Sequence, residues 1–241
     1  LAEPSSFRVY VKPEEEEDVD EGFEEEVRQF VDRGYGISLI SPLNYSMAEL
    51  RLVSRLAGSR GGLVSIHVSE TEDTYLDGDL DRALGTLVTG NTLFVHLTQL
   101  SDEDVMKLPM QPVAVCPWSN MEFIGRLPRI GIMMKRGLRP LLGTDNVALI
   151  EPNPWEEMKL LRVIMAGNEL GPVEILKMAT SWAWSWGLGY VISEGVQMRG
   201  LAIRISYENL SMDYVHDYVV TRASTRDITY MVNGQDVVEI R

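Results

Sequence analysis

The chain has 241 residues, of which 45% are hydrophobic, 24% charged and 8% aromatic, a composition that indicates a globular protein and excludes a disordered or fibrous one. Its 36 acidic and 22 basic side chains give a net charge of -14. This charge repels phosphate backbones and anionic lipids, so we expect neither nucleic acid nor a membrane surface as a partner. The single cysteine, Cys116, excludes an internal disulfide framework and a zinc cluster built from cysteines.

The sequence contains no evident membrane or export signal. No apolar run approaches the roughly 20 residues of a membrane span, and the start of the chain lacks the charged and apolar pattern of a signal peptide. Because nothing indicates an oxidising compartment either, we expect a cytoplasmic location. Leu1 is not an initiator methionine, so we expect the chain to begin inside a larger product or after processing.

Short apolar runs alternate with amphipathic stretches along most of the chain. The apolar runs predict buried strands at Phe7–Val11, Ile37–Ile40, Leu63–His67, Thr92–His96, Val113–Cys116 and Pro140–Thr144. The amphipathic stretches predict helices at Glu21–Arg33, Ser46–Leu56, Asp79–Leu87, Asp102–Leu108, Glu122–Arg136, Pro154–Ala166 and Pro172–Leu188. Such repeated strand-helix units predict a parallel sheet covered by helices.

A second, smaller region follows near residue 195. Here the pattern predicts short strands at Leu201–Ser206, Tyr214–Val220, Ile228–Val232 and Val237–Ile240, with no further helix. The pair Asn233 and Gly234 predicts a hairpin turn between the last two. We therefore expect an α/β domain over residues 1–195 and a β-rich segment over residues 196–241. The α/β domain shows about six strand-helix units, whereas a closed (β/α)8 barrel of the TIM type has eight.

Side chains that can bind a metal or move a proton follow the ends of three predicted strands. His67 ends one strand and Glu70 follows it, His96 ends the next, and Asp145 follows the strand at Pro140–Thr144. Active sites of parallel barrels form at the carboxyl ends of the strands. An imidazole and a carboxylate suit a divalent ion, and a second carboxylate beside them can act as a general acid and base. We therefore expect these side chains to converge on one site.

Structural interpretations of the same residues stay open. His67 alone could be a core histidine whose ring is satisfied by the backbone, and Asp145 could cap the helix that follows it. Burying an ionisable group without a partner costs several kcal/mol, by order of magnitude. Three strand ends that each carry such a group therefore favour a site over three separate structural roles.

Four segments resemble the motifs of one known family, in both their order and their spacing. They are IHVSET at 66–71, VHLTQLSDED at 95–104, VCPWSN at 115–120 and LLGTDN at 141–146. The chain is similar to the amidohydrolase superfamily, and within it to the metal-dependent deaminases and chlorohydrolases. The resemblance covers most of the chain and implies a (β/α)8 barrel, here incomplete, and a hydrolase that acts on C–N bonds other than peptide bonds.

The resemblance implies a role for each residue of the expected site. His67 would be the metal ligand from the fifth barrel strand, and His96 would orient the attacking water or the substrate. Asp145 would be both a metal ligand and the catalytic base, and Glu70 would shuttle protons. The polar groups of Ser119 and Asn120 would line the substrate pocket.

The resemblance also implies a cofactor and partners. The metal would be zinc, with iron as the alternative. The substrate would be a small heterocycle that carries an amidine group, from which a metal-activated water displaces ammonia. Dimers are common in the family, so the partner that completes the barrel would be either a second copy of the chain, in a homodimer, or a missing N-terminal segment.

The chain departs from the family pattern in two places. It has only three histidines and lacks the His-x-His pair of the first barrel strand, so either a preceding segment supplies that pair and completes the barrel, or the scaffold serves another purpose. In the second case the protein would be a non-catalytic binding or interaction module. The segment Ser41–Ser46 also lacks the substrate-contacting histidine that nucleoside-type members often carry there. A purine, a pyrimidine, a triazine or a related ring all stay open as substrates.

Overall fold

A computed structural model of the chain describes residues 7–9, 19, 21–87, 92–147, 151–166, 170–188, 193–205 and 210–240. The chain forms two units, which are described separately. The first comprises Leu1–Cys116 and Asn120–Pro140, and the second comprises Pro117–Ser119 and Leu141–Arg241. This division differs from the predicted boundary at residue 195, which stays a prediction.

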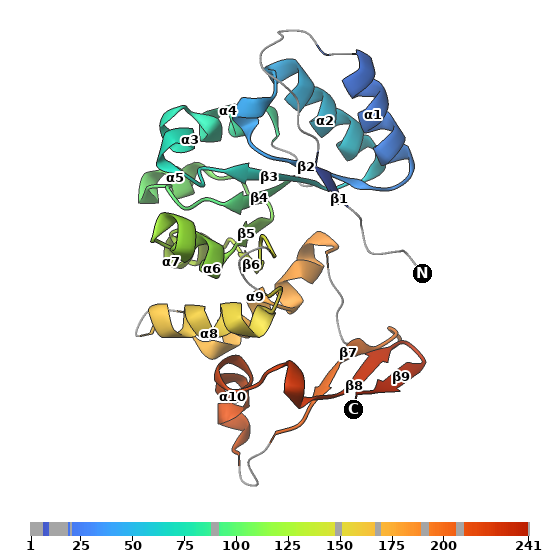
Figure 1. Ribbon diagram of the computed structural model, residues 1–241, viewed down its shortest axis with the longest axis vertical. Helices are drawn as coiled ribbons and strands as arrows, with labels where there is room; N and C mark the ends of the chain where they lie inside the picture. Colours follow the sequence, from blue (N-terminus) through green and yellow to red (C-terminus); the bar gives the residue numbers. More distant parts are fainter. Residues whose placement is uncertain are drawn as a thin grey trace. The chain divides into compact units, whose positions relative to one another are not determined.

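A parallel sheet forms the centre of the first unit. Its strands pair in chain order, and a helical connection runs between each neighbouring pair (Figure 1). The strands are β1 (Phe7–Val9), β2 (Gly36–Leu39), β3 (Val64–Val68), β4 (Thr92–His96) and β5 (Val113–Val115). Because all five run in the same direction, their carboxyl ends lie along one edge of the sheet.

Several helices of this unit begin at a residue whose side chain caps them. They are α1 (Glu21–Asp32), η1 (Pro42–Asn44), α2 (Met47–Arg60), α3 (Glu72–Leu76), α4 (Asp79–Thr86), α5 (Asp102–Lys107), the π-helix η2 (Asn120–Ile124) and α7 (Ile130–Lys135). At the start of α2, the Ser46 hydroxyl accepts a hydrogen bond from the Glu49 backbone, and the Glu49 carboxylate accepts one from the Ser46 backbone. This capping box satisfies two backbone N–H groups that the helix leaves without intrahelical partners.

The apolar faces of these helices and of the sheet make one core. Phe23 and Val27 of α1 and Val53 of α2 are buried with Ile66 of β3 and Phe94 of β4 in a single cluster. In β3, Val64, Ile66 and Val68 are fully buried, whereas His67, which lies on the opposite side of the strand, is partly exposed. The strand therefore presents its apolar side to the core and its imidazole to the other side.

The second unit contains β6 (Leu141–Leu142), helices and a small antiparallel sheet. Its helices are α6 (Pro117–Ser119), α8 (Pro154–Ile164), α9 (Pro172–Met178), η3 (Ser181–Trp186), η4 (Met212–Tyr214), α10 (Val215–Thr221) and η5 (Thr225–Asp227). The sheet has the order β7 (Arg199–Ile203), β8 (Ile228–Asn233) and β9 (Asp236–Glu239). Asn233 pairs with Asp236 across a tight turn in which Gly234 has φ +66°, so the predicted hairpin is confirmed.

All six strands predicted before residue 195 overlap observed ones, with differences at their ends. The last two residues of Phe7–Val11 lie outside the described residues, as does the last residue of Leu201–Ser206. Among the residues that the structure describes, no helix is long and apolar enough to cross a membrane.

Three predicted elements were wrong. The segment Tyr214–Val220 is helical, not a strand: most of it forms α10, which buries Tyr218 and Val220 and contacts α8 and α9. The predicted helix Glu122–Arg136 is interrupted between η2 and α7, where Pro128 lacks the N–H that a continuous helix requires. The predicted helix Pro172–Leu188 is divided into α9 and the 3-10 helix η3.

Candidate functional site

A cluster of three ionisable side chains lies at the carboxyl ends of β3 and β4 in the first unit. Glu70 reaches both imidazoles, with Oε2 3.3 Å from Nδ1 of His67 and Oε1 3.6 Å from Nε2 of His96. The two rings meet edge to face, with their centroids 4.6 Å apart. The structure therefore brings these three predicted site residues together.

The backbone at His96 explains how two imidazoles on neighbouring strands can meet. The register pairs His67 with Val95 and Val68 with His96, so an ideal pleat would point the two rings to opposite faces of the sheet. His96 and the following Leu97 instead have φ of +72° and +55°. This left-handed conformation ends the regular strand and breaks the alternation of faces at the residue that carries the second imidazole.

Backbone strain concentrates in the predicted site motifs. Among the described residues, the non-glycine positions with positive φ are Ser69, His96, Leu97 and Asp145. Each such residue costs on the order of 1 kcal/mol and persists only where surrounding contacts enforce it. Strain of this kind clusters at functional sites, so its distribution here supports a site at these strand ends.

Asp79 holds the strained turn between His67 and Glu70. Its buried carboxylate accepts hydrogen bonds from the backbone N–H of Ser69, at 2.5 Å, and from the Ser69 hydroxyl, at 2.7 Å. Burial raises the pKa of Asp79 above its usual value, although these hydrogen bonds act in the opposite direction. The turn is also tied to the loop after β4, where Gln99 donates its backbone N–H to the carbonyl of Ser69.

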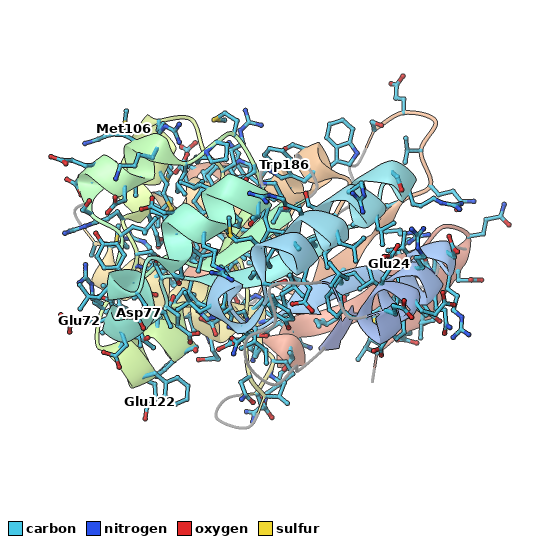
Figure 2. All side chains as sticks on the ribbon, turned by 90° about the horizontal axis from the view of Figure 1, so that it is seen from above. Glu24, Glu72, Asp77, Met106, Glu122 and Trp186 are labelled. Carbon is cyan, nitrogen blue, oxygen red and sulfur yellow. The ribbon has the colours of Figure 1, made fainter. Side chains whose placement is uncertain are left out.

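Several acidic side chains of the first unit have a different setting. Glu72, Asp77 and Glu122 are exposed and point outward from the first unit (Figure 2). Glu70, in contrast, is partly buried between the histidines, and its hydrogen bond with His67 lowers its pKa, with burial opposing this effect and the charges of both rings adding to it. Glu70 is therefore a carboxylate held in place by imidazole partners rather than a solvated surface charge.

Asn120, which was predicted to contact substrate, is buried in the first unit with both ends of its amide engaged. Its Oδ1 accepts a hydrogen bond from the backbone N–H of Cys116 at 3.3 Å, and its Nδ2 lies 2.9 Å from Nδ1 of His96. Asn120 is also the first residue of a π-helix, a rare turn that occurs often at functional sites. The side chain thus contacts the site through His96.

The second unit contains the remaining predicted residues. Asp145 follows β6 with φ +55°, and its Oδ2 accepts a hydrogen bond from the hydroxyl of Ser119 at 2.5 Å. Asp145 does not cap the helix that follows, because the N-cap of α8 is Asn153. The structural alternative for Asp145 is therefore wrong.

Glu157 is an acidic residue of this unit that the sequence analysis missed. Its side chain is buried, its Oε2 accepts the backbone N–H of Trp118 at 3.0 Å, and its Oε1 has no hydrogen-bond partner among the described residues. Burial raises its pKa to about 7, the hydrogen bond from Trp118 opposes this, and the charge of Asp145 adds to it. The spacing in the sequence could have identified it. Glu157 stands four residues before Leu161, so both side chains lie on the same, buried face of α8.

Comparison with known proteins gives a family match over most of the chain. The family model described as "Amidohydrolase family" matches residues 3–183. A 5-methylthioadenosine/S-adenosylhomocysteine deaminase of Acetivibrio thermocellus is 30% identical over 214 residues, which are 80% of this chain and 50% of that protein. The chain spans about half the length of the curated relatives it matches.

Solved structures show the same fold at low identity. The aminofutalosine deaminase of Helicobacter pylori matches with a TM-score of 0.76 and 15% identity over 96% of this chain and 67% of that one. An adenosine deaminase of Xanthomonas campestris with bound zinc matches with a TM-score of 0.71 and 16% identity over 90% and 57%. These neighbours are TIM-barrel proteins, so the predicted fold class, an incomplete (β/α)8 barrel, is confirmed.

Proposed function

The chain belongs to the amidohydrolase family, and from this premise we propose that the whole protein is a metal-dependent aminohydrolase that releases ammonia from a cyclic amidine. The observation that carries the proposal is the cluster at the ends of β3 and β4. There Glu70 lies within 3.6 Å of ring nitrogens of both His67 and His96. Two imidazoles that share one carboxylate can hold and move protons around a reacting atom.

The residues present fit a divalent cation. An ionised carboxylate only accepts hydrogen bonds, so the contact with Glu70 assigns the proton of a neutral His67 to Nδ1 and leaves the lone pair on Nε2 for a metal. Asp145 at the end of β6 is the proposed second ligand, as its place after the eighth barrel strand of the family implies. Nitrogen and oxygen donors of this kind suit zinc, and a solved neighbour contains zinc, although iron accepts the same donors.

Each residue would then have a defined task. The ion would make a water molecule nucleophilic at neutral pH. Asp145 would accept a proton from the attacking water and pass it to Glu70, which, once protonated, would deliver it to the ring nitrogen. The second proton of the water would follow the same route to the departing amino group, which leaves as ammonia. His96 would hold the water or the substrate by a hydrogen bond, and Ser119 would orient Asp145 through the bond that the structure records.

The substrate we propose first is an adenine nucleoside. Relatives that match this chain are named as deaminases of 5-methylthioadenosine and S-adenosylhomocysteine and of 5'-deoxyadenosine. Ammonia release from 5'-methylthioadenosine is therefore the first assay, with a pyrimidine and a triazine as comparison substrates.

The test combines metal content with turnover in the Asp145→Asn variant. We expect zinc in the purified wild-type protein, and a loss of turnover of about 100-fold or more in the variant, because a base and a ligand charge are removed while the volume stays the same. Melting temperature checks that the variant folds. The control is His216→Gln, which removes an exposed histidine of α10 and should change neither measurement.

Two results would contradict the proposal. Full turnover in Asp145→Asn would remove that residue from the mechanism. Wild-type protein without metal and without turnover would favour the alternative function, a binding or interaction module built on the barrel scaffold.

A further inference from the structure

The amide of Asn120 has only one orientation that satisfies both of its neighbours. The backbone N–H of Cys116 can only donate a hydrogen bond, so the atom that faces it at 3.3 Å is the amide oxygen. The amide nitrogen then faces Nδ1 of His96 at 2.9 Å. A backbone donor therefore removes the usual ambiguity between the two ends of an asparagine side chain.

This orientation determines which nitrogen of His96 carries the proton. The amide NH2 group is a donor, so Nδ1 of His96 must accept, and a neutral ring then carries its proton on Nε2. Nε2 lies 3.6 Å from Oε1 of Glu70, which is beyond hydrogen-bond distance, but the negative charge of this carboxylate favours an N–H on that side. The two contacts of His96 agree with one tautomer.

His67 has the opposite assignment, although it contacts the same carboxylate. There Nδ1 faces Glu70 and carries the proton, so Nε2 is the nitrogen with the lone pair. Glu70 thus meets Nδ1 of one ring and Nε2 of the other. The two rings are chemically different, one with an acceptor at Nε2 and the other with a donor there.

We propose that Asn120 is a positioning residue that fixes His96 as the Nε2–H tautomer. His96 then presents a hydrogen-bond donor, not a metal-binding lone pair, at its outer nitrogen. This step rests on the proposed function. The difference in tautomer explains why His67 would bind the ion while His96 would orient water or substrate. The sequence predicted a direct contact between Asn120 and the substrate, whereas in this proposal Asn120 acts through His96.

The tautomers can be read directly by two-bond 1H–15N correlation spectra of the imidazole rings. The chain has only three histidines, and the variants His96→Gln and His216→Gln assign their signals. At about pH 8, above the usual range of imidazole titration, we expect the Nε2–H pattern for His96 and the Nδ1–H pattern for His67. An Nδ1–H pattern for His96 in the wild-type protein would overturn the proposal, and this measurement needs no variant at position 120.

The Asn120→Asp variant tests the cause. A carboxylate only accepts hydrogen bonds, so Nδ1 of His96 must gain a proton, either as the other neutral tautomer or as imidazolium. The matched control is Asn153→Asp at the N-cap of α8, where a carboxylate can accept the N–H of Trp155 as the amide does. We expect His96 to change in the first variant and not in the second. An unchanged His96 pattern in Asn120→Asp would refute the role of Asn120.

Activity gives a separate readout of the same change. In the active protein we expect Asn120→Asp to lower kcat by about 10- to 100-fold with little change in KM, the usual effect of an outer-shell partner. The two proposals can fail independently. If no substrate is ever deaminated but the spectra show the Nε2–H pattern, the proposed function fails and the tautomer assignment stands. If deamination is found but His96 carries its proton on Nδ1, only the positioning role fails.

Discussion

The ionisation of Glu157 gives a prediction whose size follows from its surroundings. The carboxyl group is buried in α8 of the second unit, and among the described residues the one hydrogen bond that it accepts comes from the N–H of Trp118. Burial, with a contribution from the charge of Asp145, raises its pKa from 4.5 to about 7. At neutral pH the ionised form of Glu157 is therefore less favourable in the folded protein than in the unfolded chain.

The sign of the effect follows from proton binding. Between the two pKa values the folded state binds more protons than the unfolded state, so stability is present below pH 4.5 and is lost as the pH rises through about 7. The full interval corresponds to about 3 kcal/mol, and the part between about pH 5 and about pH 8 to about 2.5 kcal/mol. The Glu157→Gln variant has no such group. We therefore expect the stability of the variant relative to wild type to rise by about 2.5 kcal/mol over that range.

Urea unfolding at several pH values, with a chelator present, measures this difference. Using the change with pH rather than the value at one pH cancels the cost of burying the glutamine amide. The control is Glu156→Gln, which removes a half-exposed carboxylate from the same helix and its ion pair with Lys159. Curves for Glu157→Gln and wild type that stay parallel from about pH 5 to about pH 8 would show that Glu157 does not carry a raised pKa, and would refute the reasoning.

Two further predictions concern hydrogen bonds that shape the first unit. Asp79→Ala should lower the free energy of unfolding by about 2–4 kcal/mol, because the buried N–H and hydroxyl of Ser69 lose a charged acceptor. Asp79→Asn keeps one acceptor and should lose less, so equal losses in urea unfolding would argue against this account. Ser46→Ala should cost about 1 kcal/mol by removing the cap of α2, while the same substitution at the exposed Ser59 of that helix should not, and equal melting temperatures would contradict the capping role.

The sequence predicted the strands of the sheet and the hairpin of the second unit well. Strands such as Val64–Val68 and Thr92–His96 are short apolar runs between turn residues, and burial in a parallel sheet needs little more than that. The hairpin depends on Gly234, whose positive φ is a local property of the residue. Tyr214–Val220 was misread because valine and tyrosine favour strands, whereas in the structure most of the segment packs as a helix against α8 and α9.

The sequence also predicted one part of the candidate site and missed another. The sequence by itself determined which ionisable residues follow the strand ends, because strand order and the parallel direction place His67, Glu70 and His96 at one edge of the sheet. It could not determine which way the rings face or which nitrogen carries a proton. Regular alternation would have placed His67 and His96 on opposite faces. Only the tertiary structure decided otherwise, because the backbone is left-handed at His96, where the following Leu97 donates its N–H to the carbonyl of Val68, and because Asn120, far away in the chain, donates to that ring.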